Sequence, residues 1–437
     1  MNSPRGRSIV IGAGVVGTAV ALELVRRGWH TTMVDRGPAP GHGSTAASSA
    51  VVRFTYSTVA GTAMAYEGVE WWRNWADHVR LPAATPLTKF VQCGMVFFDD
   101  PSGFARGALA TLDAVGVAYE WWDADELHRR LPQFATGSWF PPTAVDDPAF
   151  GAEPISRLRG ALYTPEAGYV SDPQLAAQNL ADAAVAEGAH LRTSAEVVAV
   201  ERIDGRVCGV RLAGGEILAA DVVVNAAGPH SMLVNRLAGV VDDMAVTTRP
   251  LRQQVTHVRV PDGSPLAVED FPATADLDGG IYFRPDHHAL LVGGVEADCD
   301  PLVWLDDPDD VDLELSADEW QAQAYRLARR IPALGVPHER RGVVGVYDVS
   351  DDWMPILDRS SLAGFYMAIG TSGNQFKNAP IIGHCMAELI DAVHSGHDHD
   401  HEPVVVRGPH RGLDIDLGTF TRHRITSAEQ RTRGVLG

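Results

Sequence analysis

The first forty residues carry a regular pattern of apolar and polar positions. An apolar run at residues 9–11 enters a glycine-rich turn, an apolar helical pattern extends to Arg27, and Gly28 can end that helix before a second apolar run closes on Asp35. Strand, turn, helix and strand in this order predict a βαβ unit of the kind that binds dinucleotides.

The turn has the glycine spacing that a dinucleotide requires. Gly12 makes the tight turn, Gly14 lets the backbone approach a pyrophosphate, and Gly17 lets the helix and the strand pack closely. Asp35, at the end of the second strand, can accept hydrogen bonds from the two hydroxyls of a ribose. We therefore predict a dinucleotide site here, and a glycine-rich turn in an ordinary α/β core is the simpler alternative.

The periodicity of the remaining chain predicts further elements. Helical patterns cover residues 62–78, 104–115, 174–187 and 379–393, and a capping box of Ser316 and Glu319 begins another helix. Strand patterns cover residues 91–100, 249–260, 343–349 and 365–370, with a β-meander at 196–228 and a hairpin at 279–296. The tryptophans at 71, 72 and 75 are expected to pack in the core, and Asn378 is expected to cap the last helix.

Two stretches have weak patterns. The aspartates between residues 306 and 312 are read as a solvated acidic loop. Residues 396–437 are rich in His, Asp and Arg and are read as a solvated tail. The histidines at 394, 397, 399 and 401 could bind a metal, but a solvated tail is the stronger interpretation, so no metal is predicted.

Composition narrows the possible functions. The chain has 437 residues, of which 45% are hydrophobic, so it can bury a sizeable core. Its net charge of −20 opposes binding to nucleic acid or to an anionic membrane, and no stretch is long and apolar enough to span a bilayer. Cys93, Cys208, Cys299 and Cys385 have no paired spacing, which fits reduced thiols and a cytoplasmic location.

Four motifs now point to a family. They are IVIGAGVVG at 9–17, GSTAASSAVVR at 43–53, DVVVNAAGPHS at 221–231 and GTSGNQFKNAP at 370–380. In this order they resemble the D-amino-acid oxidase (DAO) superfamily of flavoproteins, and most of all its sarcosine oxidase, dimethylglycine dehydrogenase and glycine oxidase branch.

The resemblance implies an α/β fold in two interleaved domains. A Rossmann-like FAD-binding domain of the glutathione-reductase type would comprise residues 1–80, 161–245 and 342–395. An α+β substrate-binding domain on a mixed, largely antiparallel sheet would comprise residues 81–160 and 246–341. Residues 396–437 would follow as the tail.

The same resemblance implies FAD as the cofactor. Several relatives attach the flavin through a cysteine just before a tyrosine, where this chain has Gly345 and Val346, and His42 does not clearly match the histidine that other relatives use. FAD is therefore expected to be noncovalent. The implied FAD-binding residues are Gly12, Gly14, Val15, Val16, Gly17, Asp35, Arg36, Gly43, Ser44, Thr45, Ser48, Ser49, Val197, Ala227, Gly228, Gly345, Gly370, Ser372, Gly373, Asn374, Gln375, Phe376 and Lys377.

Candidate catalytic residues follow from the same motifs. Arg53 and Lys377 match the cations that relatives direct at a substrate carboxylate, although an arginine in this position could equally form a structural ion pair. Tyr282 and Arg284 belong to the hairpin that forms the roof of the pocket in relatives, although that face of the strand could be solvent-exposed. Lesser pocket candidates are Tyr56 and Tyr347.

These residues suggest a reaction. We expect oxidation of the C–N bond of an amino acid or N-alkyl amino acid by hydride transfer to flavin N5, with hydrolysis of the imine product and oxygen or another acceptor as the oxidant. Leu291 stands where some sarcosine oxidases have a lysine that helps oxygen to react, so oxidase and dehydrogenase both stay open. The alternatives are a 2-hydroxy acid dehydrogenase with His287 or His288 as base, the flavin subunit of a heteromeric amine dehydrogenase, or a flavin-binding scaffold with little turnover.

Overall fold

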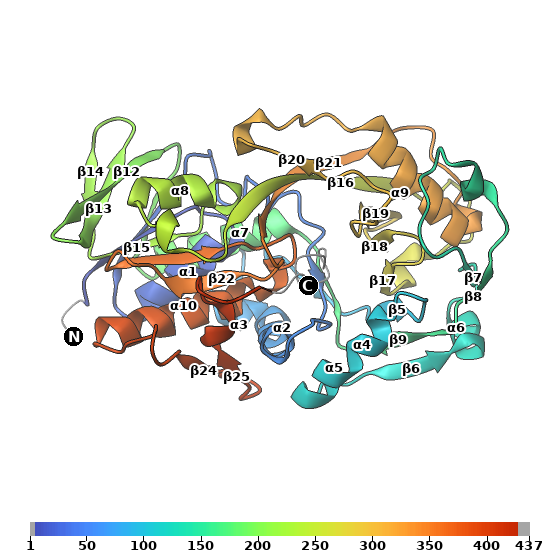
Figure 1. The fold of residues 1–437 in the computed structure, drawn as a ribbon, viewed down its shortest axis with the longest axis horizontal. Coiled ribbons are helices and arrows are strands. Elements are labelled where there is room, and N and C mark those ends of the chain that lie inside the picture. Colours follow the sequence, from blue (N-terminus) through green and yellow to red (C-terminus); the bar gives the residue numbers. More distant parts are fainter. Residues whose placement is uncertain (1–4, 427–437) are drawn as a thin grey trace.

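A six-stranded sheet holds the predicted βαβ unit. The computed structural model describes residues 5–426 (Figure 1), and the strand order in this sheet is β11-β2-β1-β15-β23-β22. Every pairing is parallel except that of β22 with β23. The strands are β1 (Arg7–Ile11), β2 (His30–Val34), β11 (His190–Arg192), β15 (Val222–Asn225), β22 (Ile356–Arg359) and β23 (Phe365–Ile369).

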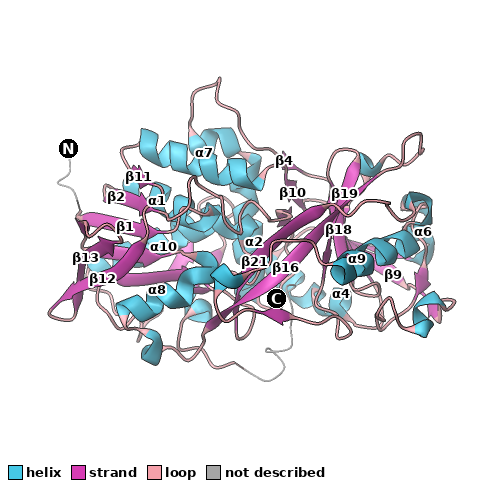
Figure 2. Cartoon of the chain, turned by 90° about the horizontal axis from the view of Figure 1, so that it is seen from above, coloured by secondary structure: helices cyan, strands magenta, loops and turns pink. Residues whose placement is uncertain are grey.

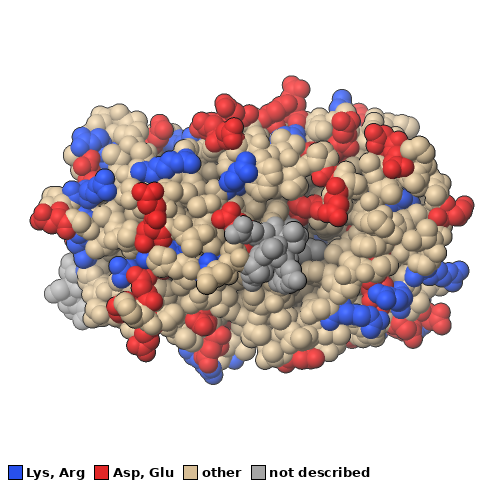
Figure 3. All heavy atoms as spheres, viewed as in Figure 1, with Lys and Arg blue, Asp and Glu red and all other residues tan. Residues whose placement is uncertain are grey.

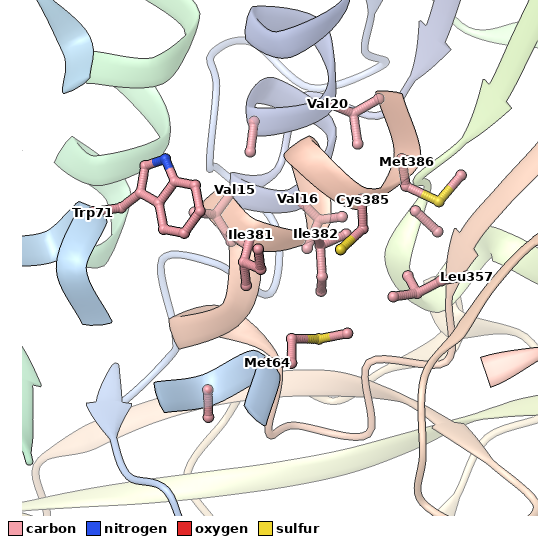
Figure 4. Close-up of a cluster of buried hydrophobic side chains, with 14 of the residues drawn as sticks. Val15, Val16, Val20, Met64, Trp71, Leu357, Ile381, Ile382, Cys385 and Met386 are labelled. Atoms are coloured by element: carbon pink, nitrogen blue, oxygen red, sulfur yellow. The ribbon is translucent and has the colours of Figure 1, made fainter. Parts of the chain in front are cut away.

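Both faces of this sheet are covered, as a parallel sheet requires. Val10 of β1 points into a core shared with the helices α1 (Val15–Arg26), α7 (Pro173–Ala186) and α10 (Ala379–His394). Ile9 and Ile11 point the other way, into a core shared with α8 (Ser231–Ala238) and the small β12-β13-β14 sheet. Figure 4 shows Val15, Val16 and Val20 of α1 against Ile381, Ile382 and Cys385 of α10.

A nine-stranded, largely antiparallel sheet forms the other half of the molecule (Figure 2). Its strand order is β20-β16-β19-β18-β17-β5-β9-β6, β21 pairs with β16 beside it, and only β17 with β5 is parallel. The strands are β5 (Met95–Phe98), β6 (Glu120–Asp123), β9 (Gly160–Thr164), β16 (Thr248–Arg259), β17 (Ala273–Asp276), β18 (Ile281–Pro285), β19 (Ala289–Gly294), β20 (Val303–Trp304) and β21 (Gly342–Ser350). The predicted fold class is confirmed by this pair of sheets.

Shorter elements complete the fold. The remaining strands are β3 (Val51–Val52), β4 (Phe90–Val91), β7 (Gly137–Ser138), β8 (Ser156–Arg157), β10 (Gly168–Val170), β12 (Val197–Ile203), β13 (Arg206–Leu212), β14 (Ile217–Ala219), β24 (Val405–Arg407) and β25 (Asp414–Asp416). The remaining α-helices are α2 (Val59–Arg73), α3 (Trp75–Val79), α4 (Phe104–Gly107), α5 (Leu109–Val115), α6 (Ala124–Arg130) and α9 (Ala317–Arg330).

Strand β21 links the two halves of the molecule. The sequence placed this strand with the cofactor-binding segments, but nine of its residues pair with β16, from Thr248 opposite Ser350 to Thr256 opposite Gly342. The strand therefore belongs to the nine-stranded sheet. The division into discontinuous domains stays a proposal.

Several local predictions need correction. The helix predicted at 62–78 breaks at Asn74 into α2 and α3, and the one predicted at 104–115 breaks at Ala108 into α4 and α5. Ser316 caps α9 as predicted, but the Glu319 carboxylate turns to Arg252 and does not return to the cap. The tryptophans at 71, 72 and 75 are buried, as predicted.

The predicted solvated tail is wrong for residues 396–426. This segment forms the β24–β25 hairpin and buries Ile415, Leu417 and Phe420. His399 is fully buried beside Asp358, and Arg422 is 2% exposed. The buried charged residues of this segment lie beside oppositely charged partners, so a segment with a polar sequence is nevertheless packed in the interior. Residues 427–437 lie outside the described part of the chain.

Two surface properties complete the description. Acidic and basic side chains are interspersed on the face shown in Figure 3. Between residues 5 and 426, no helix has both the length and the apolar character that a membrane crossing demands. The same residues contain no cluster of three metal-ligating side chains.

Candidate active site

The glycine-rich turn lies between β1 and α1. Gly12 has a φ of +104°, and a Cβ added there would overlap the Ala226 carbonyl at the end of β15. A Cβ on Gly17 would overlap the Gly12 carbonyl. A Cβ on Gly14 would meet only the Thr45 hydroxyl at 3.3 Å, so its outer face is open, and Gly14 at the N-cap offers α1 no side-chain cap of its own. The positive end of the α1 dipole can therefore face a negatively charged group.

Asp35 is held against this turn. Its carboxylate accepts hydrogen bonds from the Ala13 amide at 2.6 Å and the Gly37 amide at 2.7 Å. The backbone of residues 194–195 bonds to residues 35–37, which brings the start of β12, and with it Val197, near Asp35. Neither Asp35 nor Val197 lines the main cavity.

The main cavity extends from the glycine-rich turn into the interface of the two sheets. The predicted residues that line it are Gly14, Val15, Val16, Ser44, Thr45, Ser48, Ser49, Arg53, Gly228, Tyr282, Gly373, Asn374, Gln375, Phe376 and Lys377; of the two lesser candidates, Tyr347 lines it and Tyr56 does not. The predicted residues that do not line it are Gly12, Gly17, Asp35, Arg36, Gly43, Val197, Ala227, Arg284, Gly345, Gly370 and Ser372.

The hydroxyl-rich loop after β2 joins the two sheets beside this cavity. The Thr45 hydroxyl accepts a hydrogen bond from the Val15 amide at 3.1 Å, and the Ser44 hydroxyl donates to the Val346 carbonyl of β21 at 2.5 Å. Gly345 matters for the same contact, because a Cβ there would lie 2.8 Å from the Ala47 methyl group. The loop is therefore fixed to both β21 and α1.

Strand β18 binds this loop at Ser49. The Tyr282 phenol lies 2.8 Å from the Ser49 hydroxyl, and Arg284 Nε donates to the Ser49 carbonyl at 2.8 Å. Arg284 is 1% exposed, also bonds to the Pro285 carbonyl, and lies 4.4 Å from the centre of the Tyr169 ring. The predicted catalytic role of Arg284 therefore has no geometric support, because its guanidinium is used to hold backbone.

Arg53 and Lys377 meet at one aromatic ring. The Arg53 guanidinium carbon lies 4.7 Å and the Lys377 ammonium nitrogen 4.9 Å from the centre of the Tyr56 ring. Both cations line the cavity and each is 4% exposed. Burial and the neighbouring Arg53 charge hold the pKa of Lys377 well below its ordinary value. Burial raises the pKa of Tyr56 to about 12, so its hydroxyl stays protonated.

The segment before α10 shapes the same end of the cavity. The Asn374 carbonyl accepts hydrogen bonds from the Tyr56 hydroxyl at 2.9 Å and from Lys377 Nζ at 2.6 Å. Gly373, with a φ of +69°, leaves room for the Tyr347 ring, which a Cβ would overlap. The prediction that Asn378 caps α10 with its side chain is wrong, because its side-chain amide donates to Gln375 Oε1 at 2.7 Å and makes no capping bond.

Two other expectations changed. Arg36, predicted to bind cofactor, forms an exposed ion pair with Asp309, which also accepts from His230 at 3.0 Å. The aspartates between residues 306 and 312 are exposed, as predicted, and Asp309 also ties this stretch to Arg36 and His230. His287 and His288 are exposed at the β18–β19 turn and do not line the cavity.

The sequence of residues 7–389 matches the profile of one family, DAO, described as FAD dependent oxidoreductase. This match covers most of the chain. The chain belongs to the DAO family of FAD-dependent oxidoreductases.

Relatives of this DAO-family enzyme include mitochondrial sarcosine dehydrogenase of Mus musculus, which is 28% identical over 290 residues, covering 64% of this chain and 29% of the relative. The 4-methylaminobutanoate oxidase (formaldehyde-forming) of Paenarthrobacter nicotinovorans is 26% identical over 402 residues, covering 90% of this chain and 44% of the relative. The chain thus spans less than half the length of these two relatives. The crystal structure of glycine oxidase from Geobacillus kaustophilus has a TM-score of 0.72 at 20% identity, covering 97% of this chain and 100% of that one, which supports the fold.

The residues present fit the FAD that this family uses. The glycine-rich turn is open at Gly14, where α1 begins, and the cavity continues from there to Arg53 and Lys377. An extended dinucleotide with an anionic pyrophosphate needs such a path.

The sequence missed several residues that line the cavity. They are Ala50, Val51, Met95, Ala226, Pro229, Val346, Asp348, Ala368 and Thr371. Met95 lies in a strand with an ordinary apolar pattern, so nothing in the sequence separates it from core residues. Asp348 carried a signal of its own, since it is an acid in an apolar strand, and Ala50, Val51, Ala226, Pro229 and Thr371 lie within the motifs that carry the family resemblance. Burial raises the pKa of Asp348 to about 6.

Proposed function

We propose that this enzyme oxidises the C–N bond of an amino acid or an N-alkyl amino acid with FAD. The observation that carries the proposal is the pair of buried cations, Arg53 and Lys377, at one end of the cavity. Two basic side chains held close together in a low-dielectric site favour an anionic ligand, which stabilises the charged form of both. A carboxylate suits both, because a guanidinium can pair with it bidentately and an ammonium adds a point charge.

The names of the relatives support this substrate class. Sarcosine and 4-methylaminobutanoate both carry a carboxylate and an N-methyl amine, and the two relatives named for them are a dehydrogenase and an oxidase. We propose the same substrate class for this chain, with either oxygen or another compound as the electron acceptor.

Each part of the cavity has a role in the proposal. Bound FAD, held without a covalent link, supplies the hydride acceptor. Arg53 and Lys377 bind the substrate carboxylate and so fix which carbon faces the cofactor. Tyr282 and Tyr347 close the side formed by β18 and β21, where they limit the size of the group on nitrogen and exclude water.

The alternatives differ in what they require. A 2-hydroxy acid dehydrogenase needs a base for the hydroxyl proton, and the candidate bases His287 and His288 are exposed away from the cavity. A flavin subunit or a scaffold would need a partner for turnover. If an amino acid bleaches the flavin of the purified chain with no partner present, the flavin-subunit and scaffold alternatives are both refuted.

The test is an anaerobic screen in which flavin absorbance is followed with amino acids, N-methyl amino acids and 2-hydroxy acids. We expect bleaching with a member of the first two classes only. Arg53→Lys should raise KM roughly tenfold to a hundredfold, since a hydrogen bond to a charged group contributes about 1.5–3 kcal/mol. Arg407→Lys, at an exposed ion pair, is the control. Bleaching by hydroxy acids alone, or an unchanged KM in Arg53→Lys, would contradict the proposal.

A further inference from the structure

Lys377 occupies an unusual position for a lysine. Its nitrogen is buried, donates to the Asn374 carbonyl at 2.6 Å and lies over the Tyr56 ring. Within residues 5–426, no carboxylate is within ion-pair distance of this nitrogen. The nearest charge is another cation, Arg53.

We propose that Lys377 is the base that accepts the proton which an amino-acid substrate must lose from its ammonium group before oxidation. This inference rests on the proposed function. In solution an amino acid is a zwitterion, and a protonated nitrogen has no lone pair to assist loss of hydride from the neighbouring carbon. The substrate must therefore reach the cofactor as the neutral amine.

The geometry provides for this exchange. The N–H bond of the substrate breaks, the proton moves to the lone pair of Lys377 Nζ, and the lysine becomes an ammonium that pairs with the substrate carboxylate. No electron leaves the protein in this step and no external base is needed. One side chain then acts as proton acceptor and as carboxylate ligand, because the substrate carboxylate stabilises the charge that Lys377 gains.

The surroundings disfavour the ammonium form of Lys377 before substrate arrives. Burial and the Arg53 charge both lower the pKa of Lys377, in that order. The other titratable group against it is Tyr56, whose pKa is raised to about 12 by burial. Helix α2 contributes the neutral Trp72, and the Glu67 carboxylate of α2 is turned away, accepting from the backbone of His410 and Arg411.

The proposal predicts a distinctive proton balance on binding. Acetate has a carboxylate but no nitrogen, so its binding to the oxidised holoenzyme should take up close to one proton per flavin as Lys377 becomes charged. 2-Aminoisobutyrate is a zwitterion without an α-hydrogen, so it cannot be oxidised at the α-carbon. Its binding should take up no net proton, because the proton moves within the complex.

The measurement uses a pH indicator in weakly buffered solution at about pH 8, roughly two units below the ordinary pKa of lysine. Flavin absorbance reports binding in the same sample. Lys377→Arg is the matched variant, since an arginine stays charged at every accessible pH and still pairs with a carboxylate. It should bind acetate without proton uptake.

Two results would overturn the proposal. The first is acetate binding to the unmodified enzyme with no proton uptake, which would mean that Lys377 is already an ammonium. The second is equal uptake in Lys377→Arg, which would place the proton elsewhere. Failure of acetate and of every amino acid to bind would instead remove the proposed function, and this inference with it.

Discussion

The indole nitrogen of Trp72 donates a 2.6 Å hydrogen bond to the backbone carbonyl of Lys377. The Trp72 ring also stacks on Phe376, with centroids 5.5 Å apart and planes at 11°, and on Trp75, with centroids 4.6 Å apart. Helix α2 therefore fixes the backbone from which the Lys377 side chain enters the cavity. The contact joins residues 305 positions apart, so the sequence could not reveal it.

Trp72→Phe should weaken both the fold and substrate binding. Phenylalanine keeps an aromatic ring but leaves the buried Lys377 carbonyl without its donor, which costs about 1–3 kcal/mol. We expect the free energy of unfolding to fall by that amount and KM for a carboxylate substrate to rise. The control is Trp75→Phe, which removes a buried 3.1 Å bond to Asn179 away from Lys377. It should lower stability without changing KM, and equal KM values in the two variants would contradict the role given to Trp72.

Gly17→Ala should abolish FAD incorporation. The added methyl would overlap the Gly12 carbonyl, so α1 must move away from the glycine-rich turn. Such overpacking costs typically about 1–3 kcal/mol and here displaces the backbone that would meet a pyrophosphate. The ratio of flavin to protein absorbance after purification measures the effect. Gly107→Ala in α4, where a Cβ meets nothing within 4 Å, should purify with full flavin content.

The turn and its sheet could be predicted because their signals are local. Glycine spacing, the apolar run of α1 and the acid at Asp35 all act within a stretch of about thirty residues, and each has one physical reading. The hairpin at 279–296 also followed from alternation and turn residues, whereas the largely antiparallel character of the other sheet was implied by the family resemblance. These elements are specified by neighbours in sequence.

The errors arise where distant residues decide the outcome. Arg284 shares a face of β18 with Tyr282, yet Tyr282 lines the cavity and Arg284 holds the Ser49 carbonyl. The alternation of side chains along a strand predicts which residues share a face of the sheet, but it does not predict which other part of the protein covers that face. The packed segment at 396–426 was missed for a related reason, because its buried charges are neutralised by partners such as Asp358 that come from earlier in the chain.

Asp348→Asn should stabilise the protein in a pH-dependent way. Burial raises the pKa of Asp348 from 3.8 to about 6, so the folded state binds this proton more tightly than the unfolded state. Stability therefore falls as pH rises from about 4 to about 6, and above that the cost reaches about 3 kcal/mol. Asparagine is neutral and can still accept the 2.7 Å hydrogen bond from the Gly370 amide.

Denaturant titration at several pH values checks this prediction. The gain of Asp348→Asn over the unmodified protein should be near zero at about pH 4 and largest at about pH 8. Asp351→Asn, at an exposed carboxylate three positions on, should show no such growth. A gain that is the same at every pH would mean that the buried carboxylate is not the cause.

Arg422→Met should destabilise the whole protein, because Arg422 compensates a buried charge. Its guanidinium lies 3.0 Å from the fully buried Asp358 carboxylate and also pairs with Asp243 and Asp400. Methionine fills similar space but leaves Asp358 buried without its partner, which costs about 3–5 kcal/mol. Arg407→Met removes an arginine from the same segment, but its pair with Asp414 is 69% and 62% exposed, so the expected loss is at most about 1 kcal/mol. Both values come from denaturant unfolding. A solvated tail would instead give two equally small losses, so the difference between these variants decides whether residues 396–426 are part of the fold.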